Sequence, residues 1–338
     1  MLKAGLRSLV GDAVCTQTMG TFAAGTFLVA MALQMGASNI AIGLIAALGP
    51  LAQVLQVPAV MLIDRIGSRR AVVVLASLVA RAFWLLAAAT PWLVPEAWRI
   101  EVFLAALTGY YGLGTISGLA FNAWMRDLIP ESIRGSNLAT RLAVATVVAA
   151  VLSLATGAGV DWFKQFVPEV AVYSAYLVLA WVAGWAGVWF LSRIPEPRPV
   201  PSPPQSVAGV IAEPMRDRNF TRLLWFLGAW NFAVNLAAPF FTVFMLKRLS
   251  LDMTLIMALL VASQVANVSF LRLWGRLADR FSNKSVLLVS GPLFLLGILT
   301  WGPSPTSTAS GRSRCHSWWR PTYWQGSRPP AFRSAPAT

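Results

Sequence analysis

Residues 60–93 read VMLIDRIGSRRAVVVLASLVARAFWLLAAATPWL, an apolar run that ends in a short basic loop and is followed by a longer apolar run. A helix needs about 20 apolar residues to cross a bilayer, and the second run is long enough. A window of about 19 residues predicts nine such segments, at residues 14–35, 39–62, 71–93, 101–124, 139–160, 171–192, 221–246, 253–273 and 285–301. The sequence therefore predicts an all-α, multi-pass membrane protein.

Composition supports this class. The 338 residues are 57% hydrophobic and 12% charged, whereas soluble domains carry about 25% charged residues. The net charge of +14 comes from cations in short loops between the apolar runs, which argues against a nucleic-acid surface. The two cysteines, Cys15 and Cys315, have no metal-site or disulfide spacing, and His316 is the only histidine. We expect no metal, no cofactor and no catalytic residue.

The loop cations predict the orientation. With a cytoplasmic N-terminus, the inner loops hold 17 Lys and Arg, Arg141 among them, and the outer loops hold four. Cytoplasmic loops carry the excess of positive charge in membrane proteins. We therefore expect a protein of the bacterial inner membrane, surrounded by lipid, with its N-terminus in the cytoplasm.

The segments divide the chain into four parts. Residues 1–193 predict a six-helix half, residues 194–220 a proline-rich cytoplasmic linker, and residues 221–301 a partial second half of three helices. Residues 302–338 contain five arginines, no acidic residue and no apolar period. We expect this tail to result from a shifted reading frame, with a natural disordered tail as the alternative.

Two loops repeat at an offset of 215 residues. Asp64-Arg65-Ile66-Gly67-Ser68-Arg69-Arg70 follows the second segment, and Asp279-Arg280-Phe281-Ser282-Asn283-Lys284 follows the eighth, preceded by Gly275. Gly67 predicts a tight reversal between two helices, and an acid beside it can accept hydrogen bonds from the first N–H groups of a neighbouring helix. A third loop, 124–135, reads WMRDLIPESIRG.

These loops resemble the signature G-x-L-x-D-R-x-G-R-R and its companion loops in the major facilitator superfamily, over about residues 1–301. The resemblance implies two six-helix halves that rock about a central site and are clamped by loop charges on the cytoplasmic side. Carried over, the gate residues are Asp64, Arg65, Gly67, Arg69, Arg70, Asp127, Arg134, Gly275, Asp279, Arg280 and Lys284. The alternative is that they only anchor and orient the loops.

Polar residues inside the segments are candidates for a substrate cavity. Arg81 lies near the middle of the third segment, where a charge is costly without a partner or water. A functional Arg81 would favour an anionic group on the solute, and a structural arginine is the alternative. Helical spacing also groups four amides that could line a path or only join helices, namely Asn231, Asn235, Gln264 and Asn267. Gln17, Gln53 and Gln56 invite the same interpretation more weakly.

The resemblance implies transport of a small solute by alternating access. The coupling ion, H⁺ or Na⁺, is not evident, since Asp12 at the entrance of the first segment is explained equally by protonation or by a helix cap. With three helices of the family plan missing, we expect impaired transport. The alternatives are a non-transporting receptor or assembly protein and a membrane transferase, although no acid, histidine or nucleophile constellation favours the last.

Overall fold

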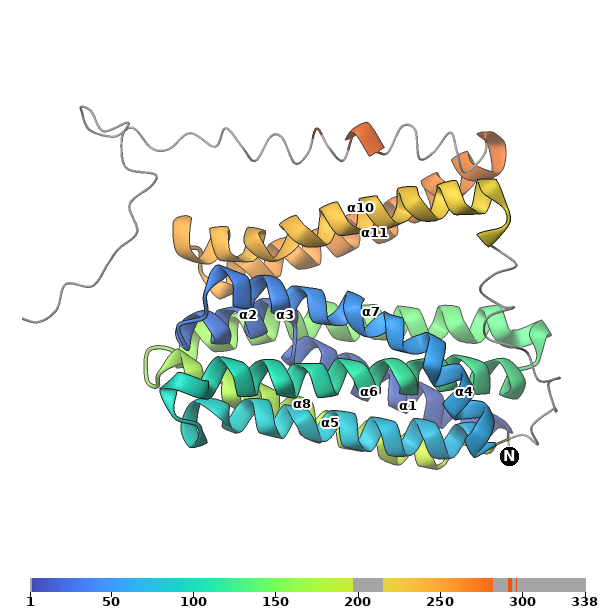
Figure 1. Cartoon of the computed structure of the whole chain (residues 1–338), viewed down its shortest axis with the longest axis horizontal. Coiled ribbons are helices and arrows are strands. Elements are labelled where there is room, and N and C mark those ends of the chain that lie inside the picture. Colours follow the sequence, from blue (N-terminus) through green and yellow to red (C-terminus); the bar gives the residue numbers. More distant parts are fainter. Residues whose placement is uncertain (1, 197–214, 282–290, 294–295, 297–338) are drawn as a thin grey trace, which may run out of the picture. The chain divides into compact units, whose positions relative to one another are not determined.

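A computed structural model describes residues 2–196, 215–281, 291–293 and 296, and this part of the chain is built from helices joined by short turns (Figure 1). Residues 2–268 belong to one compact unit, and the account below concerns this unit unless stated. The elements are α1 (Leu2–Phe22), α2 (Gly25–Gln34), α3 (Asn39–Ala52), η1 (Gln53–Leu55), α4 (Gln56–Ile66), α5 (Arg69–Leu93), η2 (Glu96–Trp98), α6 (Arg99–Leu128), α7 (Glu131–Phe163), α8 (Glu169–Ser192), α10 (Arg218–Val243), η3 (Phe244–Arg248) and α11 (Met253–Phe281).

Eight stretches within the described residues are long and apolar enough to cross a membrane, and they match the first eight predicted segments to within a few residues. The ninth predicted segment, 285–301, lies almost wholly outside the described residues. The same holds for most of the predicted linker and for the whole predicted tail. The prediction of an all-α membrane protein is confirmed.

The first two crossings are each made of more than one helix. Ala24, in an extended conformation, separates α1 from α2 within the crossing Ser8–Gln34. Pro50 lies inside α3, and the 3₁₀ turn η1 joins α3 to α4 directly after it. A proline removes one backbone hydrogen bond and crowds the turn before it, so Pro58, the third residue of α4, disfavours a regular α-helical turn at η1.

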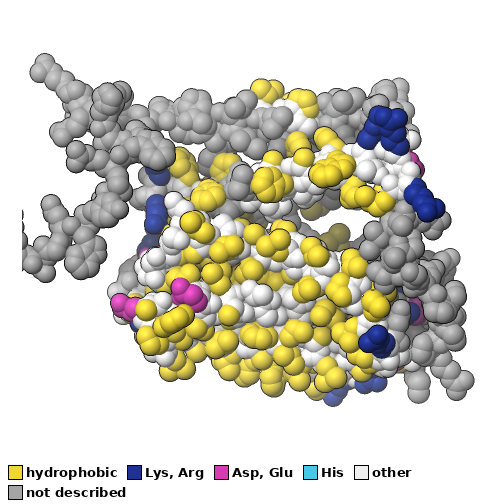
Figure 2. Space-filling view, in the orientation of Figure 1, with side chains coloured by type: hydrophobic (Ala, Val, Ile, Leu, Met, Phe, Trp, Pro, Cys, Tyr) yellow, Lys and Arg dark blue, Asp and Glu magenta, His cyan; other side chains and the backbone are white. Residues whose placement is uncertain are grey.

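Apolar side chains cover the outside of the bundle. Figure 2 shows hydrophobic side chains over much of the visible face, with charged groups gathered toward its left and right ends. Leu75 in the second turn of α5 is 62% exposed, and Trp92, Trp98 and Trp162 are exposed close to the ends of their crossings. Tryptophan favours the membrane–water boundary, so this surface is suited to lipid contact.

Two apolar clusters form the core of the bundle. The large cluster includes Phe27, Trp84, Phe103 and Tyr173, with other side chains of α1, α2, α5, α6, α7 and α8. The small cluster lies nearer the α4–α5 turn and includes Leu9, Val73, Trp124 and Leu191. Helices α1, α5, α6 and α8 each contribute to both clusters, so the segment of each helix between them forms a separate layer.

The turn between α4 and α5 has the predicted form. Gly67 ends α4 with φ +71°, and its N–H donates to the Ile63 carbonyl oxygen. The Ser68 hydroxyl accepts a hydrogen bond from the Ala71 N–H and so caps α5. The left-handed conformation disfavours every residue that carries a Cβ atom, which confirms the role predicted for Gly67.

Replacing Gly67 by alanine tests this turn. We expect Gly67→Ala to destabilise the protein by about 1 kcal/mol, because a Cβ atom disfavours positive φ. Thermal unfolding in detergent measures the effect. Gly43→Ala is the matched control, since Gly43 lies within α3 with open space around its Cα and ordinary helical dihedrals. Equal midpoints for the two variants would contradict the explanation.

Candidate functional site

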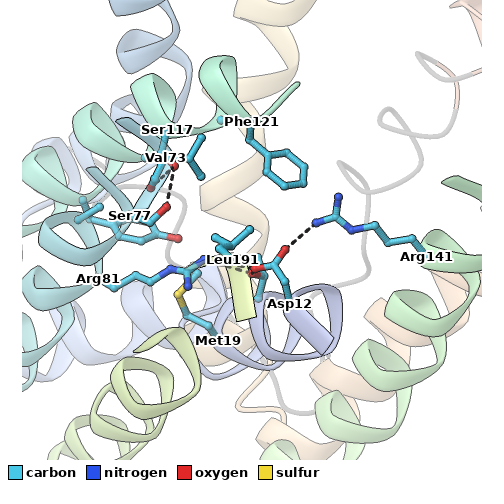
Figure 3. A pocket seen from close by; sticks show the side chains of 14 residues that line it. Asp12, Met19, Val73, Ser77, Arg81, Ser117, Phe121, Arg141 and Leu191 are labelled. Carbon is cyan, nitrogen blue, oxygen red and sulfur yellow. Dashed lines mark hydrogen bonds and ion pairs between the residues drawn. The ribbon is translucent and has the colours of Figure 1, made fainter. Parts of the chain in front are cut away.

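A polar layer separates the two apolar clusters. Asp12 and Thr16 of α1, Ser77 and Arg81 of α5, and Ser117 of α6 line a cavity of about 200 Å³. The helices bring them together because each lies between a residue of the small cluster and one of the large cluster on its own helix. Figure 3 shows Arg81 and Arg141 reaching Asp12 from opposite sides.

Asp12 is the centre of this layer. The residue is 2% exposed. Its Oδ2 accepts a hydrogen bond from Arg141 Nη2 at 2.9 Å, and its Oδ1 accepts one from the Thr16 hydroxyl at 3.1 Å. Arg81 Nη2 lies 4.0 Å from Oδ1. A buried carboxylate is tolerated when it is paired and hydrogen-bonded, and Asp12 meets both conditions.

Arg81 is held by the backbone of α8. Its guanidinium donates to the Gly184 carbonyl oxygen and, at 3.2 Å, to the Thr16 hydroxyl. Two glycines of α8 make room for it, because a Cβ atom at Gly187 would lie 2.8 Å from Arg81 Nη1 and one at Gly184 would lie 3.0 Å from Arg81 Cδ. Arg81 therefore has the partners that a charge at this depth requires, and its bond to a carbonyl oxygen of α8 fits the structural alternative.

Two expectations from the sequence are wrong here. Asp12 lies in the third turn of α1, which begins at Leu2, so a helix cap does not explain it. Arg141, counted with the inner loops, lies within the crossing Thr140–Phe163 and lines the cavity. The signal in the sequence was a charge at the start of an apolar run, since Asp12 directly precedes the segment predicted at 14–35 and Arg141 lies at the start of the one at 139–160.

Hydroxyl groups complete the cavity wall. The Ser77 and Ser117 hydroxyl oxygens are 2.6 Å apart, and Ser117 also donates to the Val73 carbonyl oxygen at 3.3 Å. Arg141 extends over the ring of Phe121, with 4.7 Å from its Cζ to the ring centre. The cavity thus offers two guanidinium groups, one carboxylate and several hydroxyls within otherwise apolar surroundings.

The predicted gate residues are partly brought together. Arg69 forms an ion pair with Asp127, which joins the α4–α5 turn to the end of α6. The side chain of Arg70 donates to the Ser192 carbonyl oxygen at the end of α8. Arg65 is exposed. The side chains of Asp64 and Arg134 lie outside the described set.

Glu196 is a residue of this region that the sequence did not single out. Its carboxylate accepts a hydrogen bond from the Ser68 hydroxyl at 2.8 Å and one from the Arg70 N–H at 3.0 Å. An acid thus binds a free N–H group at the start of α5, but it is Glu196 and not the loop aspartate Asp64 that was predicted, whose side chain lies outside the described set. Glu196 lies 126 residues from Arg70, so spacing within one loop could not reveal it.

The second copy of the loop cannot be compared side chain by side chain. Gly275, Asp279 and Arg280 fall within α11, but only their helical backbone is described. Lys284 lies outside the described residues. Their predicted gating role remains a prediction.

The amide candidates separate into two groups. Asn231 and Asn235 are exposed on α10, and their side chains donate to carbonyl oxygens of their own helix, those of Leu227 and Asn231. Gln264 of α11 and Gln17 of α1 instead line a second cavity of about 420 Å³ against α7. The Asn267 side chain lies outside the described set. Gln53 and Gln56 are exposed and bond to each other.

A second ionic cluster, which the sequence analysis missed, joins α7 to the start of α11. Asp161 accepts hydrogen bonds from the Met253 N–H at 3.2 Å, the Thr254 N–H at 2.7 Å and the Thr254 hydroxyl at 2.6 Å. Lys164 donates to Asp161 at 2.8 Å and to Asp252 at 2.9 Å. Asp161 is 93 residues from Thr254 in the chain, too far for a local motif.

In the part of the chain that the structure describes, no three His, Cys, Asp or Glu side chains gather in a way that could hold a metal ion.

A multi-pass helical bundle with a charged cavity inside defines a membrane protein of the transporter class. A family model described as Major Facilitator Superfamily matches residues 13–313, most of the chain, and the match runs past Trp301, where the resemblance was expected to end. The chain belongs to this superfamily of secondary transporters. A search among curated proteins finds no match.

Removing the Asp12 charge tests the electrostatics of the cavity. We expect Asp12→Asn to lower stability by about 3 kcal/mol, because loss of one partner leaves a buried charge uncompensated. The double variant Asp12→Asn with Arg141→Gln should regain part of this loss, since it removes one of the unpaired cations. Thermal unfolding in detergent measures both effects. An Asp12→Asn variant as stable as the wild type would contradict the pairing.

Proposed function

We propose that this chain moves a small solute across the bacterial inner membrane by alternating access, with the Asp12–Arg81–Arg141 cavity as its solute site. The observation that carries the proposal is a cavity inside a lipid-embedded bundle that is lined by two buried charged side chains, Asp12 and Arg81, and by the half-buried Arg141. Placing a charged residue at such depth in a membrane costs free energy, and such residues mark solute or ion pathways in membrane proteins. Membership of the superfamily supplies the secondary-transport class.

The loop contacts support a rigid cytoplasmic end of the first half. The Arg69–Asp127 pair joins two of the three resembling loops, and Glu196 joins the end of α8 to the start of α5. In the proposed cycle these contacts hold the cytoplasmic ends of the first half as one rigid unit, which then moves against the second half. The proposed orientation, with these loops in the cytoplasm, rests on the excess of loop cations on that side.

The two alternative functions make different demands. A non-transporting receptor on the same scaffold needs a cavity open to one side only. A membrane transferase needs acid, base or nucleophilic side chains near the membrane surface. The described cavity lies between two apolar clusters and contains one carboxylate and two guanidinium groups, a set suited to binding.

Access from both sides of the membrane tests the proposal. Ser117→Cys, in a background with Cys15→Ser and Cys315→Ser, places a thiol in the cavity wall. We expect a membrane-impermeant thiol reagent to label it in right-side-out and in inside-out vesicles, because alternating access exposes the cavity to each side in turn. The labelled fraction is measured by a gel shift.

Leu179→Cys in the same background is the control, since Leu179 is 46% exposed on the apolar outside of α8. It should stay unlabelled in both vesicle types. Labelling of Ser117→Cys from one side only would favour the receptor and reject alternating access.

A further inference from the structure

The two arginines of the cavity are held in different ways. Arg81 donates to a backbone carbonyl oxygen and to the Thr16 hydroxyl, and two glycines of α8 shape the space around it. Its side chain is 8% exposed. Neither contact depends on a charged partner, so Arg81 can keep its place whatever the cavity contains.

Arg141 is held more loosely. Within the described part of the chain it donates one hydrogen bond, to Asp12 Oδ2, and its guanidinium lies over the Phe121 ring. Its side chain is 26% exposed. A guanidinium has five N–H donors in a planar fork that matches a carboxylate. Arg141 therefore has donors to spare and a single carboxylate bond to exchange.

The charges of the cavity do not cancel. Arg81 and Arg141 bring two positive charges and Asp12 one negative charge, which leaves an excess of one positive charge. A low-dielectric site strongly favours neutrality, and the lining adds hydroxyl groups in place of a second acid. One monovalent anion would neutralise the site, and a volume of about 200 Å³ limits it to a small molecule.

We propose that Arg141 binds a small organic monoanion of the carboxylate type directly, in place of its bond to Asp12, while Arg81 is a positioning residue that holds Asp12 and α8 together. This inference rests on the proposed function, since it assigns the solute class of the same cavity. Asp12 stays beside Arg81 throughout, so binding requires no covalent or proton-transfer step.

Ligand-dependent thermal shifts of the purified full chain test the assignment. The probes are small monocarboxylates, the corresponding neutral amides and dicarboxylates of similar size. We expect at least one monocarboxylate to raise the unfolding midpoint saturably, while its amide has no effect and the dicarboxylate binds at least tenfold more weakly. Absence of a shift with every monocarboxylate, or an equal shift with the amide, would overturn the proposal.

Substitutions of Arg141 and Arg81 distinguish the roles proposed for the two arginines. Arg141→Gln should abolish the shift, and Arg141→Lys should raise the apparent Kd at least tenfold, because lysine lacks the planar fork. Arg81→Lys should lower the midpoint without ligand but keep the apparent Kd within threefold. Unchanged affinity in Arg141→Gln would reject this inference alone, whereas one-sided labelling of Ser117→Cys would reject the transport function even if anions bind.

The second ionic cluster lies at the end of α7 remote from the α4–α5 turn. Asp161 caps the first N–H groups of α11, and Lys164 bridges Asp161 to Asp252. Gly157 lets the two helices approach, because a Cβ atom there would lie 3.0 Å from the Thr254 Cα atom. Carboxylates are stabilised at a helix N-terminus. We infer that the cluster of Asp161, Lys164, Asp252 and Thr254 is a latch. It keeps the bundle closed at the end remote from the α4–α5 turn, which is called the far side below.

Opening the latch should expose the cavity to the far side. In the Ser117→Cys background, Asp161→Asn should increase labelling from that side at least threefold, and the milder Thr254→Val should act in the same direction. Glu169→Gln is the matched control, because Glu169 lies at the same end but accepts hydrogen bonds from Gln34 of α2 and from the Tyr173 hydroxyl of its own helix, all within the first six crossings. Equal effects of Asp161→Asn and Glu169→Gln, or none, would overturn the inference.

The latch should not respond to ordinary changes of pH. Hydrogen bonds to Asp161 and Asp252 raise the pKa of Lys164 from 10.5 to about 12. A raised pKa means that its stabilisation is complete below pH 10.5 and is lost only as the pH rises through about 12. Lys164→Met should therefore increase far-side labelling by the same factor at pH 6 and pH 8, and a difference above twofold would contradict this mechanism.

Discussion

The cost of charge within a lipid-embedded bundle governs how the first helices are arranged. Asp12 cannot remain buried without cations beside it, and Arg81 and Arg141 reach it from different helices. The Gly184 carbonyl oxygen and the glycines of α8 add a further helix to the same centre. One carboxylate thus ties α1 to α5, α7 and α8 at the level where apolar packing is interrupted.

Apolar packing surrounds this centre on both sides along the helices. Leu9 of the small cluster and Met19 of the large cluster flank Asp12 on α1, while Val73 and Trp84 flank Arg81 on α5. The clusters restrict access of water to the charged layer, which strengthens electrostatic interactions within it. The same packing makes the layer specific, because a shift of one helix along its axis would place an apolar side chain against a charge.

Hydropathy alone predicted the crossings, and local chemistry predicted the Gly67 turn and the need of Arg81 for a partner. These features depend on residues close together in the chain. The partners of Arg81 and Asp12 could not be predicted, since 129 residues separate Asp12 from Arg141 and 103 separate Arg81 from Gly184. Glu196 and Asp161 were missed for the same reason. A single sequence reveals periods and turns, but not which distant helices become neighbours.

The glycines that surround Arg81 have an evolutionary consequence. Their small size is useful only while a long side chain from α5 occupies the space beside Gly184 and Gly187. A lineage that lost this arginine would leave a void on α8, and voids in a packed bundle are unfavourable. Residues 81, 184 and 187 should therefore change together among homologues, with bulkier side chains on α8 wherever a smaller one replaces the arginine.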